Sequence, residues 1–281
     1  MVQPNARAPA GKNLPPTTGA PNPMRDYSAN KLFDLSGKIA LVTGGSRGLG
    51  REMVRAFALA GADVVIASRK LAQCEELAEE IRETTGRRAF PVSAHVGDWK
   101  QVEAMVEAAY EHFGRIDVLV NNAGLSPLYP SLNDVSEDLY DKVLSVNLKG
   151  PFRAMAMVGA RMAAGDGGSI INVSSTASVN PNRTTAPYGA AKAALNHMTF
   201  SFAQEYGPKV RVNCIIPGPF DTDISVGWFH SEEFQERART KISLKRGGQP
   251  NEIVGAALYF ASDASSFTTG ATLRVDGGSA G

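Results

Sequence analysis

The sequence predicts an α/β fold in which helices cover both faces of a seven-stranded parallel sheet. Short apolar runs of β-forming residues alternate with segments of helical spacing along most of the chain. A glycine-rich turn, Gly44 to Gly50, joins the first such strand to the first such helix. A chain of 281 residues with 43% hydrophobic residues can bury one large core. One α/β domain therefore accounts for the chain.

The N-terminal segment has a different composition. Residues 1–24 contain six prolines and almost no large apolar side chains. Such a segment buries too little surface to offset the entropy of ordering it. We predict a disordered tail over residues 1–30 and a catalytic domain over residues 31–281, with order beginning near Leu32 and Phe33.

The first strand, turn and helix form a phosphate-binding pattern. Residues 39–43 form the strand, the glycines of the turn follow a TGxxxGxG spacing, and residues 53–59 have helical spacing. This order places backbone N–H groups and a helix N-terminus against a phosphate. A second strand, 63–67, follows, where a Rossmann unit carries its ribose-reading residue.

The same alternation continues to the C-terminus, and it predicts that the ligand crevice lies at the carboxyl ends of the strands. Ser136 is the expected N-cap of a long helix. The remaining expected strands are 89–94, 117–121, 169–173, 210–216 and 272–275, and the expected helices are 71–84, 99–113, 137–162, 186–206, 224–241 and 251–262.

Asn147 and Pro151 lie together inside the long helix. Proline has no N–H group, so Pro151 cannot donate to the carbonyl of Asn147 four positions earlier. That carbonyl is predicted to be free for another partner. The alternative is a helix kink without a functional role.

Tyr188 and Lys192 are four residues apart on one helix face, and Ser175 precedes Tyr188 by thirteen residues. A lysine cation about 5 Å from a phenol would favour phenolate by roughly two pK units. The pair is therefore interpreted as an acid with a lowered pKa that exchanges a proton near neutral pH. The alternative is a chance YxxxK pattern on an amphipathic helix.

With the segments Asn121 to Gly124 and Pro217–Gly218, these motifs occur in an order and spacing that resembles the short-chain dehydrogenase/reductase family over about residues 33–281. The resemblance implies that Tyr188 is the general acid or base, and that Lys192 lowers its pKa and binds the nicotinamide ribose. It also implies that Ser175 binds the substrate carbonyl oxygen, and Ser174 is the other candidate for this role. The backbone carbonyl of Asn147 is expected to bind a water that continues a proton path from Lys192 to solvent. The cofactor contacts that we expect are Gly44, Ser46, Arg47, Gly48, Leu49, Gly50, Ser68, Arg69, Val96, Asn121, Ala123, Gly124, Tyr188, Lys192, Pro217, Gly218 and Thr222.

The end of the second strand predicts NADP(H) as the cofactor. Ser68 stands where an NAD enzyme has an acid, and Arg69 follows, with Arg47 able to approach from the glycine turn. Guanidinium groups suit the 2′-phosphate. Alternatively, both arginines are merely solvated. At the end of the third strand, His95 replaces the family's aspartate. A neutral imidazole could accept the same hydrogen bond from the adenine amino group, but the departure puts this contact in doubt and leaves the binding of the cofactor as expected.

The predicted function is NADP(H)-dependent interconversion of a ketone and a secondary alcohol, with a small carbonyl compound or a 3-oxoacyl thioester as substrate. The layout is similar to 3-oxoacyl-carrier-protein reductases and to gluconate 5-dehydrogenases alike. An NAD(H)-dependent sugar-acid or polyol dehydrogenase and a non-catalytic NADP(H) sensor are the alternatives. The pocket is expected to be walled by residues 125–130, 176–187 and 221–246, which contribute Leu128, Tyr129, Asn180, Asn182, Arg183, Trp228 and Phe229.

Composition argues against several partners. The net charge of +1 gives no reason to expect nucleic acid, and no apolar run is long enough to span a membrane, so we expect a cytoplasmic protein. The two cysteines and four histidines show no metal-ligand spacing, so no metal site is expected. Apolar residues on several faces of the helices 137–162 and 186–206 predict a homotetramer: Phe152, Met155, Met157, Met198, Phe200 and Phe202.

Overall fold

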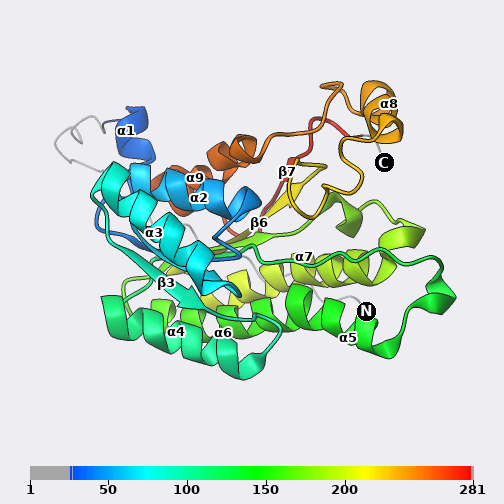
Figure 1. Cartoon of the computed structure of the whole chain (residues 1–281). Helices are drawn as coiled ribbons and strands as arrows, with labels where there is room; N and C mark the ends of the chain where they lie inside the picture. The colour runs from blue at the N-terminus through cyan, green and yellow to red at the C-terminus, as the bar shows by residue number, and fades with distance from the viewer. Residues whose placement is uncertain (1–25, 27, 280–281) are drawn as a thin grey trace, which may run out of the picture.

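The computed structural model describes residue 26 and residues 28–279, and its architecture confirms the predicted fold (Figure 1). One parallel sheet has the strand order β3-β2-β1-β4-β5-β6-β7. Every strand begins and ends within one residue of its expected bounds. The strands are β1 (Ile39–Thr43), β2 (Asp63–Ser68), β3 (Ala89–Ser93), β4 (Val118–Asn121), β5 (Gly168–Val173), β6 (Val210–Pro217) and β7 (Thr272–Val275).

Two layers of helices cover the sheet (Figure 1). On one face, α2 (Gly48–Leu59), α3 (Leu71–Thr85) and α9 (Val254–Ala261) bury a core that includes Phe57, Leu77 and Phe260. On the other face, α4 (Trp99–Phe113), α6 (Gly150–Ala164) and α7 (Ala186–Tyr206) bury a core that includes Met105, Met155 and Leu195. Burial on both faces explains why the inner strands read as continuous apolar runs rather than as alternating ones.

The strand order reverses between β1 and β4, because the chain crosses first to one side of β1 and then to the other. Helices on the two sides diverge at this point and leave a crevice at the carboxyl ends of the strands. Thr43, at the end of β1, pairs with Ala67 of β2 and with Asn121 of β4. The glycine turn and the segment that follows Asn121 therefore meet at the reversal.

The expected helix 137–162 is divided in the structure. Ser136 caps α5 (Glu137–Leu144) as predicted, by accepting a hydrogen bond from the Leu139 N–H. Residues 145–149 then form a π-helical turn, in which the Gly150 N–H donates to the carbonyl of Ser145, five positions back. Pro151 explains the break, because it cannot supply the next donor of an α-helix.

The expected helix 224–241 begins later than predicted, as α8 (Glu232–Lys241) with Ser231 as its N-cap. Before it, the Ser225 hydroxyl donates to the carbonyl oxygens of Phe220 and Thr222, and such side-chain bonds compete with helix formation. The segment has a small core of its own, separate from the two main cores. We call it the insertion core, and it consists of Phe229, Phe234, Ala238 and Ile242 with Trp228 packed against them.

The chain ends differ in what the structure describes. Most of the expected tail, residues 1–25 and 27, lies outside the described residues, and α1 (Ala29–Leu32) begins two residues before the expected domain boundary. Leu32 and Phe33 are half-buried. The expected helix 251–262 starts with a 3₁₀ turn, Pro250–Ile253, before α9. Within the described residues, every helix is too short or too polar to cross a bilayer.

Candidate active site

A cavity of about 1010 Å³ lies at the carboxyl ends of the strands and collects most of the expected site residues. It extends from the glycine turn past β2, β4 and β5 to α7 and α8. The expected residues that line it are Gly44, Ser46, Arg47, Gly48, Leu49, Ser68, Arg69, Val96, Ala123, Gly124, Ser175, Tyr188, Lys192, Pro217, Gly218 and Thr222. Gly50, Asn121 and Asn147 do not line it.

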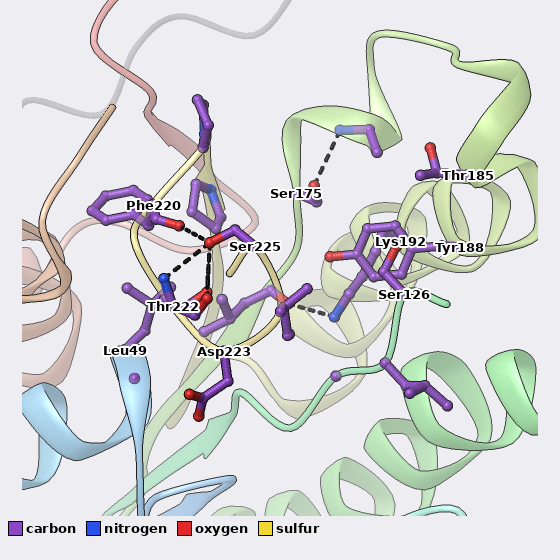
Figure 2. Close-up of a pocket in the computed structure, with 18 of the residues that line it drawn as sticks. Leu49, Ser126, Ser175, Thr185, Tyr188, Lys192, Phe220, Thr222, Asp223 and Ser225 are labelled. Atoms are coloured by element: carbon purple, nitrogen blue, oxygen red, sulfur yellow. Dashed lines mark hydrogen bonds between the residues drawn. The ribbon is translucent and has the colours of Figure 1, made fainter. Parts of the chain in front are cut away.

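Tyr188 and Lys192 both face the cavity from the first turns of α7, as their spacing predicts. The Lys192 ammonium lies 5.8 Å from the centre of the Tyr188 ring. It is only 2% exposed, and its Nζ donates a 2.8 Å hydrogen bond to the carbonyl oxygen of Val173 at the end of β5 (Figure 2). The lysine is thus fixed between helix and sheet before any ligand contacts it.

Burial controls the protonation of this pair. It lowers the pKa of Lys192 to about 8, because the charged form has lost its water. Burial likewise raises the pKa of Tyr188, while the hydroxyl of Ser175 acts in the opposite direction. The direction is therefore the opposite of the expected lowering of the phenol pKa. The reason is that the ammonium bonds to a carbonyl rather than to the phenol, and desolvation prevails.

Ser175 and Ser174 have different partners. Ser174 is 2% exposed, and its hydroxyl donates to the carbonyl oxygen of Lys192, which holds α7 against β5. The Ser175 oxygen accepts the Ala177 N–H at 3.2 Å (Figure 2), which leaves its own proton to be donated to the Tyr188 phenol or to a substrate oxygen. Of the two serines, Ser175 has the hydroxyl that can bond a substrate oxygen.

Asn147 lies behind the cavity wall. Its side chain accepts the N–H of Leu125 and donates to the carbonyl oxygens of Leu125 and Val143, at 3.2, 2.8 and 2.9 Å. A Cβ atom added at Gly124 would lie 3.3 Å from the Asn147 Oδ1 and 3.8 Å from the Lys192 Nζ. The side chain therefore fixes the loop after β4. A role for the backbone carbonyl stays a prediction.

The glycine turn has the backbone geometry that its sequence predicts. Gly44 and Gly48 adopt positive φ angles of 63° and 54°. At Gly50, an added Cβ would lie 2.2 Å from the carbonyl oxygen of Gly44, so a side chain would push α2 away from the turn. Gly50 is thus required for packing of the turn, although it does not line the cavity.

The two asparagines after β4 have separate roles. Asn121 is buried in the sheet, where it donates to Asn172 of β5, which in turn donates to Thr199 of α7. Asn122 lines the cavity, and its amide donates to the carbonyl oxygens of Thr43 and Gly44. Asn122, rather than the expected Asn121, is therefore the residue of this pair that lines the cavity. The position of Asn122 directly after the end of β4 could have indicated this, because successive side chains of a strand point to opposite faces, so Asn121 and Asn122 cannot face the same side.

At the β2 end of the cavity, Ser68 accepts a 2.9 Å hydrogen bond from Ser46. Arg69 and Lys70 follow it along the cavity wall, and no acid stands at the end of β2. Arg47 points elsewhere than expected: its guanidinium pairs with Asp223, from the loop after β6, at 3.1 Å. This half-exposed ion pair joins the glycine turn to the loop opposite.

His95 lines the cavity, but its exposed nitrogen is a donor. The Nδ1 atom accepts the N–H of Gly97 at 3.1 Å. A neutral imidazole with an accepting Nδ1 carries its proton on Nε2. A hydrogen bond from the adenine amino group to His95 is therefore not supported, because the remaining ring nitrogen of the neutral imidazole can only donate.

The substrate half of the cavity has partly different walls from those expected. Leu128, Tyr129, Asn180, Asn182 and Trp228 line it. Phe229 belongs to the insertion core instead. The carbonyl oxygen of Arg183 accepts a hydrogen bond from the Tyr129 hydroxyl. Other lining residues in the expected wall segments include Ser126, Thr185, Ile224, Arg237 and Lys241.

These residues fit a dinucleotide cofactor. The turn before α2 offers backbone N–H groups and a helix N-terminus to a diphosphate, and basic side chains flank it. At the other end, a phenol, a hydroxyl and an ammonium surround a space suited to a reacting carbonyl. Among the described residues, no three His, Cys, Asp or Glu side chains are grouped so that they could hold a metal ion.

Comparison with known proteins gives matches over most of the chain. A family model described as enoyl-(acyl carrier protein) reductase matches residues 44–280. An uncharacterised oxidoreductase of Mycobacterium tuberculosis is 41% identical over 249 residues, which cover 88% of this chain and 94% of that protein. A 3-oxoacyl-[acyl-carrier-protein] reductase of Thermotoga maritima is 36% identical over 245 residues, 87% of this chain and 98% of that protein.

Solved structures agree with these matches. A gluconate 5-dehydrogenase from Burkholderia cenocepacia, described in complex with NADP and tartrate, superposes with a TM-score of 0.85. It is 35% identical, and the alignment covers 89% of this chain and 98% of that one. The similarity therefore extends to the complete fold and to the edge of the sheet that bears the cavity.

The buried ammonium predicts a stability that depends on pH. The pKa of Lys192 is about 8 in the folded protein and 10.5 in the unfolded chain, so the unfolded chain binds more protons between these values. Stability relative to a Lys192→Met variant should therefore rise by about 1–3 kcal/mol from pH 8 to pH 10. Denaturant titrations at several pH values measure it. Lys209→Met, which removes an exposed lysine that also donates to a carbonyl, should show no such trend. A constant difference between wild type and Lys192→Met would contradict the assignment.

Proposed function

This chain belongs to the short-chain dehydrogenase/reductase family, an oxidoreductase family, and we propose that it interconverts a ketone and a secondary alcohol with NADP(H). One observation carries the proposal: a single cavity holds Ser175, Tyr188 and Lys192 together with a phosphate-binding glycine turn. We further propose that residues 31–281 form the catalytic domain and that the enzyme acts on a small carbonyl compound or a 3-oxoacyl thioester.

Tyr188 is the proposed proton donor in reduction. When bound, the reduced nicotinamide supplies a hydride to the carbonyl carbon, and the phenol gives its proton to the carbonyl oxygen. The raised pKa of Tyr188 supports this direction, because the phenol stays protonated near neutral pH. Ser175 donates a second hydrogen bond to the same oxygen, which stabilises the negative charge that develops there.

Lys192 is proposed to stabilise the phenolate and to contact the ribose. Once Tyr188 has lost its proton, an ammonium 5.8 Å from the ring favours the anion that remains. Its pKa of about 8 leaves it mostly charged at pH 7, yet close enough to neutrality to pass a proton on. The carbonyl of Asn147, which lacks a donor at position 151, is the proposed site of a water that continues this path to solvent.

The choice of NADP(H) rests on the β2 end of the cavity. Ser68, with its hydroxyl bonded to Ser46, leaves room for a phosphate where a carboxylate would repel it. Arg69 and Lys70 supply positive charge there. Arg47 can join them only by leaving Asp223. The NADP in the description of the gluconate 5-dehydrogenase structure supports the same choice.

A sugar-acid dehydrogenase is the second candidate. The polar walls formed by Asn180 and Asn182 favour it, and the gluconate 5-dehydrogenase is a relative of similar shape. The presence of Ser175, Tyr188 and Lys192 in one cavity argues against a sensor without catalysis. The cytoplasmic location and the absence of a metal site stay predictions.

Replacement of Tyr188 by phenylalanine should abolish turnover while cofactor affinity changes little, because only the transferable proton is lost. We expect kcat to fall by 10²- to 10⁴-fold. NADPH consumption at 340 nm and the quenching of protein fluorescence by NADPH measure the two quantities. Tyr259→Phe, which alters a tyrosine outside the cavity, is the control. If Tyr188→Phe kept more than about a tenth of wild-type kcat, another group would be the donor.

NADPH should be preferred over NADH by at least tenfold in kcat/KM, since the phosphate gains charge-assisted contacts worth roughly 1.5–3 kcal/mol each. Ser68→Asp combined with Arg69→Leu should shift the preference toward NADH. Steady-state kinetics at moderate salt test both statements. Lys100→Leu removes an exposed cation away from the cavity and should leave the ratio unaltered. Equal efficiency with NADH in the unmutated protein would refute this view of Ser68 and Arg69.

A homotetramer is proposed from the surface of α6 and α7. Phe152 and Phe200 are 40% and 58% exposed, and Trp99 of α4 lies beside Phe152. Aromatic rings on neighbouring helices suit a two-fold contact between subunits. Light scattering at micromolar concentration should give four times the 29.8 kDa chain mass, and Phe200→Asp should reduce it. A monomer mass for the wild type would remove the proposal.

A further inference from the structure

One face of α8 lines the substrate half of the cavity with charged side chains. Glu233, Arg237 and Lys241 follow one another at intervals of four residues, so they lie along one face of the helix, and all three line the cavity. Phe234 and Ala238 attach the helix to the insertion core. This anchoring keeps the charged face directed at the cavity.

The two cations on this face form no ion pair among the residues that the structure describes. Within the described residues, no carboxylate lies within 4.0 Å of the Arg237 guanidinium or the Lys241 ammonium, although Glu233 is one turn away. Arg239, on another face of the same helix, pairs with Glu236, and Arg246 beyond the helix pairs with Glu252. The guanidinium of Arg237 instead lies 5.4 Å from the centre of the Phe234 ring.

These cations are distant from the group that faces the cofactor phosphate. Arg69 and Lys70 follow β2, whereas α8 follows β6, four strand positions away in the sheet order. At about 4.8 Å per strand, the carboxyl ends of β2 and β6 are roughly 19 Å apart, and residues 218–231 lie between the end of β6 and α8. The residue after the end of α8, Ile242, also forms a β-bridge with Ser279, which follows β7. One phosphate cannot serve both groups.

We propose that Arg237 and Lys241 form an anion site for the substrate, so that the enzyme prefers carbonyl compounds carrying a carboxylate or a phosphate. The inference rests on the proposed oxidoreductase function of the same cavity and names its substrate class. A guanidinium and an ammonium one helical turn apart offer several N–H donors to one anionic group. Tyr188 and Ser175 then act on the carbonyl at the other end of the molecule.

The test compares charged ketones with neutral analogues that carry the same reacting carbonyl group. Levulinate and its methyl ester form one pair, and acetoacetyl-coenzyme A and the neutral acetoacetyl-N-acetylcysteamine form the other. Wild-type kcat/KM with NADPH should be at least tenfold higher for the charged member of one pair. A preference within the first pair identifies a carboxylate as the anion, and one within the second identifies a phosphate. Added salt should reduce the preference, because both cations are exposed.

Variants decide whether α8 is responsible. Arg237→Gln combined with Lys241→Gln should lower the charged-to-neutral ratio of kcat/KM at least tenfold. Arg239→Gln removes a charge from the same helix outside the cavity and should leave the ratio as it is. Binding is measured independently by the fluorescence of Trp228, which lines the cavity, during titration of the NADP-loaded enzyme with levulinate or coenzyme A. The double variant should weaken it at least tenfold.

The outcomes separate this inference from the proposed function. Reduction of the neutral ketones with equal ratios in wild type and double variant would overturn the anion site and leave the oxidoreductase intact. Anion binding that depends on Arg237 and Lys241, without NADPH consumption on any ketone, would uphold the site and refute ketone reduction. If the wild-type enzyme showed no anion binding and no preference for the charged ketones, the inference would be overturned.

Discussion

The reversal of strand order between β1 and β4 is the constraint on which the site depends. Since all seven strands are parallel, their carboxyl ends lie along one edge, and the crossovers diverge only where the order reverses. The glycine turn after β1 and the segment after β4 meet there. Buried hydrogen bonds from Asn121 to Asn172, and from Asn172 to Thr199, join β4, β5 and α7 just beneath the site. The placement of α7 relative to the strand ends is thereby fixed by the core.

The site is preorganised, because several of its polar groups are already held by hydrogen bonds within the protein. The Val173 carbonyl already binds Lys192, and the Asn147 side chain already holds Leu125, so these groups need little rearrangement when a substrate arrives. Desolvation lowers the pKa of Lys192 to about 8 and raises the pKa of Tyr188, so that the phenol stays protonated near pH 7. Both effects arise from the same exclusion of water, and together they leave a protonated phenol beside a lysine that is mostly charged at pH 7 but loses its proton more readily than an exposed lysine.

Much of the fold could be predicted from sequence, because strands buried on both faces leave continuous runs of β-forming residues. Helix interruptions were harder to predict. The π-helical turn before Pro151 and the late start of α8 depend on hydrogen bonds that a periodic pattern does not reveal. Within the site, the motifs located the cavity walls correctly. They could not show that Arg47 pairs with Asp223, that His95 donates, or that desolvation determines the pKa of Tyr188.

The insertion core has a consequence for how such an enzyme diverges. Phe229, Phe234, Ala238 and Ile242 stabilise the segment around α8 without joining either main core. Substitutions on the cavity face of α8 therefore leave the packing of the sheet untouched. New substrate preferences can evolve there by single mutations, at a site that is buffered from the folding stability of the domain.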